Sequence, residues 1–148
     1  MVMLKEFLKL KFTLIMLYGI YAFMSDIEAM FHQVKIPKDD RDKLRFLWWP
    51  DGSWDSPPAR YRMTAYLFGA VSSPSVANFS LKRTALDNKD DFDDETIETL
   101  LSDFYVDDCL HSLDDEHSAI RLIKELMELC KRGGFRLHKW ICNSSSIF

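Results

Sequence analysis

The sequence has no C-x-x-C pair and no H-E-x-x-H motif, and its cysteines are odd in number. The three cysteines are widely spaced: Cys109, Cys130 and Cys142. This spacing fits reduced thiols better than a zinc site or a disulfide framework. We therefore predict an intracellular, cytoplasmic protein that is not secreted.

Excess positive charge is also missing. The 148 residues include 19 lysines and arginines against 23 aspartates and glutamates, which gives a formal net charge of -4. Most of the non-specific affinity for nucleic acid comes from basic side chains that contact phosphates. The charge balance therefore argues against a strongly basic, self-sufficient nucleic-acid binder.

A long hydrophobic run is the third absence. The apolar segment 12–24 follows three lysines but is too short to span a bilayer as a helix, and no small-x-small cleavage site follows it. We expect residues 1–24 to be an apolar leader that runs as a buried helix or strand into the next domain, 25–148, with no membrane partner. A signal peptide or short membrane anchor is the alternative.

The hydrophobic content, 47%, is enough for one domain with a real core. Its periodicity predicts an α+β fold, an antiparallel sheet with both helices on one face, as in split βαβ (ferredoxin-like) domains. The expected strands cover 44–49, 61–68, 135–141 and a hairpin within 100–113; the expected helices cover 74–86 and about 119–130, with caps at Ser112 or Asp114 and an end at Gly133; an acidic loop is expected over 87–98.

Two places hold carboxylates that need an explanation. Asp107 and Asp108 lie at the expected hairpin tip, where adjacent negative charges repel each other unless a cation holds them. Asp26 follows an apolar stretch in which a buried carboxylate would be costly without a partner. A solvated turn and a helix cap are the ordinary alternatives. Near the pair, His111 is either a supporting group or a partly exposed strand histidine.

Four segments together resemble the palm of a reverse transcriptase, most closely that of BEL/Pao-type long-terminal-repeat retrotransposons. They occur in the family's order and spacing: DIEAMFHQVKIPKDDRDKLRFLWWPDG (26–52), YRMTAYLFGAVSSPSVANFSLKRTA (61–85), FYVDDCLHS (104–112) and GGFRLHKW (133–140). The resemblance implies a polymerase palm and covers nearly all of the chain from Asp26 to Asn143.

The resemblance implies an RNA-directed DNA polymerase that adds deoxynucleotides to a primer 3′ end. Asp26 matches the aspartate of the first palm motif, and Asp107 and Asp108 match the acid pair of the third. These carboxylates, with the backbone carbonyl of Ile27, would hold two Mg²⁺ ions, or Mn²⁺, which prefer oxygen ligands. The implied partners are an RNA template, a DNA primer and deoxynucleoside triphosphates.

Other residues around the nucleotide are implied in the same way. Phe31 matches the aromatic gate that excludes a ribonucleotide 2′-hydroxyl by steric clash, with core packing as the alternative. Phe68 and Gly69 match the second motif, where a glycine permits close approach of backbone to nucleotide. Retroviral enzymes have glutamine in place of Phe68, so a glutamine contact to the sugar cannot be transferred.

Three basic residues complete the implied site. Lys139 matches the lysine of the fourth motif, a candidate proton donor to pyrophosphate. Either Lys43 or Arg45 could contact the triphosphate, and the sequence does not decide between them.

The chain departs from the family at both ends. Few residues precede Asp26 or follow Trp140, so the fingers and the thumb are largely missing, as are the protease, RNase H and integrase that a full, particle-associated element carries. We therefore expect the isolated chain to be inactive. The alternative to a polymerase fragment is a catalytically dead remnant that keeps only the fold; a metal-dependent nuclease is a more distant one.

Overall fold

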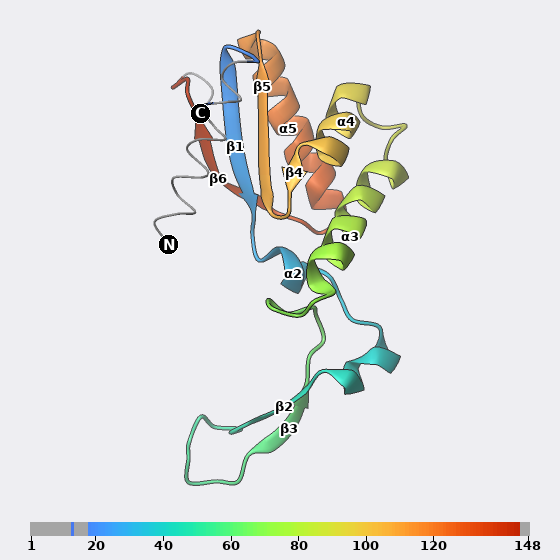
Figure 1. Ribbon diagram of the computed structural model, residues 1–148, viewed down its shortest axis with the longest axis vertical. Helices are drawn as coiled ribbons and strands as arrows, with labels where there is room; N and C mark the ends of the chain where they lie inside the picture. Colours follow the sequence, from blue (N-terminus) through green and yellow to red (C-terminus); the bar gives the residue numbers. More distant parts are fainter. Residues whose placement is uncertain (1–12, 14–17, 146–148) are drawn as a thin grey trace. The chain divides into compact units, whose positions relative to one another are not determined.

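The computed structural model describes residue 13 and residues 18–145 (Figure 1). Its elements are β1 (Tyr21–Ile27), α2 (Met30–Gln33), the 3-10 helix η1 (Lys38–Lys43), β2 (Arg45–Trp48), β3 (Ala59–Arg62), α3 (Ser73–Asp87), α4 (Asp94–Ser102), β4 (Phe104–Tyr105), β5 (Asp108–Leu113), α5 (Glu116–Arg132) and β6 (Leu137–Cys142). These elements form two compact units: the first unit comprises the described residues up to Glu28 and from Asn78 onward, and the second unit runs from Ala29 to Ala77. The α+β class is therefore confirmed.

The first unit is built on a four-stranded sheet with the order β4-β5-β1-β6, in which all neighbouring strands are antiparallel (Figure 1). Helix α5 packs against β5 and β6, and α4 packs against α5 and β4. The Phe23 ring contacts the rings of His111 and Trp140. His111 lines a pocket together with residues of α4, and Trp140 lines another together with residues of α5. Both helices therefore cover the face of the sheet that carries Phe23.

Helix α5 forms as predicted, because its apolar residues recur every three or four positions. Its buried residues are Ala119, Leu122, Ile123, Leu126, Leu129 and Cys130. The N-cap is Asp115, whose side chain accepts a hydrogen bond from the Ser118 N–H at 2.7 Å. The expected caps at Asp114 and Ser112 are therefore wrong, by one residue and three residues respectively. The predicted end at Gly133 is confirmed, and Gly134 adopts the positive φ of 80° that often follows a helix.

The segment before the carboxylate hairpin differs from the prediction. Residues 94–102 form α4, whereas an acidic loop and the start of a strand were expected there. Asp94 and Glu95 lie in its first turn, where negative charge is favourable, and Ile97 and Leu100 are buried. Helix α4 is also tied to α5, because Arg121 pairs with Glu95 at 2.8 Å.

The second unit contains the predicted antiparallel hairpin, but its strands are shorter than expected. β2 and β3 pair over four residues each, with Arg45 opposite Arg62, and Lys35 and Ala65 form one further antiparallel bridge. Helix α3 starts in this unit and agrees with its predicted bounds to within one residue.

The apolar run before Asp26 joins the sheet. β1 passes through the boundary expected at residue 24, because Tyr21 to Met24 already pair with β5. The rest of the expected leader lies mostly outside the described residues. Within the described part of the chain, no helix is both long and apolar enough to cross a bilayer.

Candidate active site

Two of the three predicted carboxylates are direct cross-strand neighbours. Asp26 lies near the end of β1, Asp108 begins β5, and the antiparallel register places them opposite each other. Opposed residues share a face of the sheet, and their Cβ atoms are about 5 Å apart. Because Phe23 faces the helices, the alternation along β1 puts both carboxylates on the other face. Like charges in this position favour a bound or neighbouring cation.

Asp107 lies in the two-residue turn that joins β4 to β5, as predicted. Its carbonyl oxygen accepts a hydrogen bond of 2.8 Å from the Ile27 N–H, so the turn is fixed to the end of β1. Val106, the other turn residue, has a φ of 59°, a conformation that glycine usually supplies and that strains a β-branched residue.

Strand β6 brings two basic side chains to Asp26. The His138 Nε2 atom lies 2.5 Å from Asp26 Oδ1, and the Lys139 Nζ atom lies 3.5 Å from Asp26 Oδ2. The side chains of Asp26 and His138 are only 27% and 24% exposed, so solvent screens this contact incompletely. Lys139 is 68% exposed.

Backbone strain gathers around these carboxylates. Among the described residues, three that are not glycine have a positive φ: Ala29 (49°), Val106 (59°) and Lys139 (52°). Val106 precedes Asp107, Lys139 follows His138, and Ala29 comes three residues after Asp26. Such conformations cost of order 1–3 kcal/mol each and cluster at functional sites. The positions of Val106 and Lys139 support this end of the sheet as the candidate site.

The donor set fits a hard divalent cation in kind, since carboxylates and a nearby backbone carbonyl are what Mg²⁺ prefers. Among the described residues, no three His, Cys, Asp or Glu side chains form a group that could hold a metal ion. Instead, the Asp26 carboxylate is in contact with His138 and Lys139. These two side chains therefore occupy the Asp26 carboxylate in this structure.

The residues predicted to surround the nucleotide all belong to the second unit. The structure brings two of them together, because the Phe31 and Phe68 rings have centroids 5.9 Å apart. Phe68 is 81% exposed, and Gly69 has a φ of 91° that side chains rarely adopt.

Lys43 and Arg45, the candidates for the triphosphate, each have an acidic partner three residues earlier. Lys43 pairs with Asp40 at 2.7 Å and Arg45 with Asp42 at 2.9 Å. Hydrogen bonds from these basic groups to the aspartates raise the pKa of both Lys43 and Arg45. Neither cation is therefore free to bind phosphate without giving up part of an ion pair.

Cys109 and His111 lie on the opposite, helix-covered face of β5. Burial raises the pKa of the Cys109 thiol well above its ordinary value, so Cys109 packs as a protonated side chain. His111 Nδ1 lies 2.5 Å from Asp103 Oδ2. His111 is therefore a strand histidine paired with Asp103, and its suggested support of the carboxylate pair is wrong.

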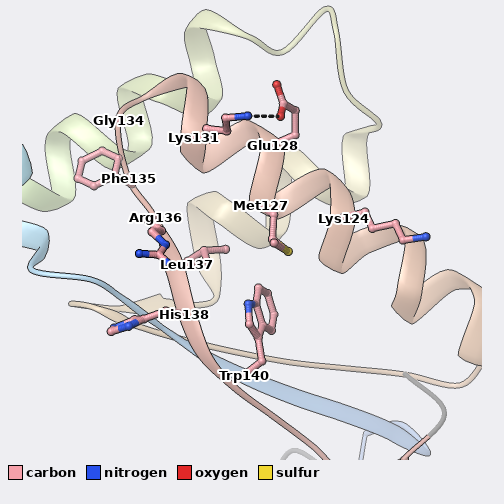
Figure 2. A pocket seen from close by; sticks show the side chains of 10 residues that line it. All are labelled: Lys124, Met127, Glu128, Lys131, Gly134, Phe135, Arg136, Leu137, His138 and Trp140. Carbon is pink, nitrogen blue, oxygen red and sulfur yellow. Dashed lines mark ion pairs between the residues drawn. The ribbon is translucent and has the colours of Figure 1, made fainter. Parts of the chain in front are cut away.

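An open groove of about 830 Å³ lies between α5 and β6 (Figure 2). Met127 points from the helix toward Leu137 and Trp140 on the strand side. Lys131 on the groove's rim is within 3.8 Å of Glu128. The groove lies on the helix-covered side of the sheet, its lining includes His138, and its rim charges are partly compensated.

His138 is the site residue that sequence reasoning missed. It stands next to Lys139 in the segment GGFRLHKW, but only the pairing of β6 with β1 places it opposite Asp26. A search for an aspartate and a histidine on neighbouring antiparallel strands would have found it only with the correct register.

The sequence matches no protein-family model and no curated protein.

Proposed function

We propose that this chain is the palm of an RNA-directed DNA polymerase of the BEL/Pao retrotransposon type. The observation that carries the proposal is the register of β1 and β5, which sets Asp26 opposite Asp108 beside the turn that holds Asp107. The sheet has the strand order β4-β5-β1-β6, and helices connect β1 to β4 and β5 to β6. This is the topology of two interleaved split βαβ units, and it supports a palm.

In this proposal Asp26, Asp107 and Asp108 hold two Mg²⁺ or Mn²⁺ ions, together with the Ile27 carbonyl. The ions supply positive charge for activating the primer 3′-hydroxyl and for stabilising the leaving pyrophosphate. The sheet keeps the carboxylates on a rigid support, so little reorganisation is needed when charge develops. Lys139, which is mostly exposed, is the candidate proton donor to pyrophosphate.

The second unit would contact the incoming nucleotide. Phe31 is the proposed gate against a 2′-hydroxyl, supported by its contact with Phe68, and Gly69 allows close approach of the backbone. Lys43 or Arg45 would contact the triphosphate. RNA template, DNA primer and deoxynucleoside triphosphates are the proposed partners, with protease, RNase H and integrase domains fused in a full element.

A primer-extension assay tests the proposal. The chain would be joined to a fingers segment and a thumb from a related element and assayed on an RNA template with Mg²⁺. We expect Asp107→Asn to lower extension by about a hundredfold or more, since it removes charge at the reacting centre. Asp114→Asn, an exposed aspartate beyond β5, is the matched control and should extend like the parent. Equal extension by Asp107→Asn would eliminate the metal assignment.

A catalytically dead remnant is the second candidate. It is favoured by the net charge of -4 and by the ion pairs that occupy Lys43 and Arg45. It predicts no extension by the reconstructed protein with Mg²⁺ or Mn²⁺. Extension that depends on Asp26 would exclude it.

A further inference from the structure

Both carboxylate oxygens of Asp26 have basic partners on β6. His138 Nε2 is 2.5 Å from Oδ1, and Lys139 Nζ is 3.5 Å from Oδ2. Whether the imidazole is neutral or charged, an Nε2–H can donate to the carboxylate. The contact with His138 is the main one, because it is shorter than that with Lys139 and His138 is much less exposed.

A β-bulge produces this arrangement. Met24 pairs with Ile141 and Asp26 with His138, so β6 uses three residues where β1 uses two. The extra residue falls next to Lys139, whose φ is 52°. In Figure 2 the His138 side chain points away from α5, while the Trp140 ring points toward it.

The bulge places His138 and Trp140 on opposite faces of the sheet. Residues i and i+2 of a regular strand share a face, so His138 and Trp140 would point the same way. With the bulge, Trp140 can pack against Phe23 while His138 reaches Asp26. A lysine at positive φ is strained, and such strain persists only where the surrounding structure enforces it.

We propose that His138, assisted by Lys139, competes with the divalent cation for Asp26. The two side chains hold the carboxylate in the cation-free protein, and cation binding releases His138 from Oδ1. A hydrogen-bond donor and a cation cannot use the same lone pair, and the Lys139 ammonium group also repels an approaching cation. This inference rests on the metal site of the proposed function, which it extends by naming a competitor built into β6.

Binding of Mn²⁺ to the 148-residue chain, followed through the electron paramagnetic resonance signal of free Mn²⁺ at one fixed pH, tests the competition. We expect His138→Ala to tighten binding by about three- to tenfold, as loss of one competing hydrogen bond to a charged group predicts. Lys139→Met should tighten it less, because Lys139 is exposed and more distant. When Asp26→Asn is added to His138→Ala or to Lys139→Met, the tighter Mn²⁺ binding should be lost.

Two further variants separate competition from general damage. His138→Gln keeps a side-chain N–H of similar reach and should bind Mn²⁺ nearly as the parent does. His111→Ala removes an imidazole that also lies 2.5 Å from a carboxylate, that of Asp103, on the helix-covered face of the same sheet. Its Mn²⁺ affinity should not change, even if its stability falls.

The results distinguish the inference from the proposed function. Unchanged or weaker Mn²⁺ binding by His138→Ala, with parent binding that depends on Asp26, would overturn the inference and leave the metal site standing. If no variant binds Mn²⁺ in a manner that depends on Asp26, the metal assignment of the proposed function fails and the competition fails with it.

A direct readout comes from nuclear magnetic resonance of the imidazole nitrogens. Adding Mg²⁺ to the parent chain should shift the His138 Nε2 resonance as its hydrogen bond to Asp26 is lost. The His111 resonances serve as an internal reference and should stay in place. An unmoved His138 signal at saturating Mg²⁺ would also overturn the inference.

Discussion

The two units of the chain differ in how completely they bury large apolar side chains. In the first unit, the sheet and α5 bury large residues completely, including Phe23, Leu122 and Leu126. In the second unit, all the residues of β2 are exposed, and Leu47 and Trp48 are 62% and 58% exposed. An isolated two-stranded hairpin is marginally stable in water, whereas a four-stranded sheet covered by helices supports itself.

Under the proposed function, the two units would have different roles. The carboxylates lie on the first unit, where strands on both sides of β1 fix their positions. The predicted nucleotide contacts lie on the second unit, whose exposed aromatic pair Phe46 and Tyr61 is stacked at 5.6 Å on the hairpin. The proposed function thus places the charge chemistry, which needs fixed geometry, on the unit with the larger buried core.

The largest expected contrast comes from the same substitution in each unit. Leu126→Ala should cost about 2–5 kcal/mol of unfolding free energy, because Leu126 is fully buried and its truncation leaves a cavity. Leu47→Ala should change the stability by less than about 0.5 kcal/mol. Urea unfolding of both variants measures the difference. Similar losses would mean that the hairpin is packed in solution as tightly as the core.

Exchanging glycine and valine at positive φ compares the connections of the two hairpins, at Gly52 and at Val106. Gly52 in the second unit has a φ of 66°, and an added Cβ atom would meet open space, so Gly52→Val should cost about 1–2 kcal/mol from the backbone alone. Val106→Gly removes similar strain but adds about 0.5–1 kcal/mol of chain entropy in the unfolded state, so we expect a change between zero and a small gain.

Thermal and urea unfolding would check both exchanges. Gly52→Ala is the matched control for side-chain size, because it adds a Cβ atom at the same positive φ without the branched methyl groups. A clear loss of stability in Val106→Gly would show that the valine side chain contributes packing that outweighs its strain.

The smallest expected effect on stability comes from two aspartates with lowered pKa values, Asp115 in the first unit and Asp42 in the second. Backbone hydrogen bonding from Ser118 lowers the pKa of Asp115 at the start of α5, and hydrogen bonds from Arg45 and Arg62 lower the pKa of Asp42. A lowered folded-state pKa gives stability that is present above the ordinary value of 3.8 and is lost as the pH falls through the folded value.

Asp115→Asn and Asp42→Asn should therefore each be slightly less stable than the parent at neutral pH, and the gap should close in acid. Added salt should shrink the effect at Asp42, which depends on exposed ion pairs, more than that at Asp115. Urea midpoints at neutral and acidic pH, with and without salt, give the comparison. A gap that persists unchanged in acid would contradict the assignment.

Much of the fold could be predicted from local pattern. Helix α5 follows from its apolar period, the hairpin tip at Asp107 follows from two apolar runs around an acid pair, and the end of α5 follows from Gly133. Helix α4 was missed because its acidic residues resemble a solvated loop, and its buried side packs against α5, which is distant in the sequence.

The sequence by itself indicated which residues would carry the proposed chemistry: three aspartates in segments of recognisable order, and a lysine near the end. Only the tertiary structure decided which of them meet. The register of β1 sets Asp26 opposite Asp108, and a bulge in β6 turns His138 toward the same carboxylate. Register and bulges arise from packing between strands distant in the sequence, so no local pattern of residues encodes them alone.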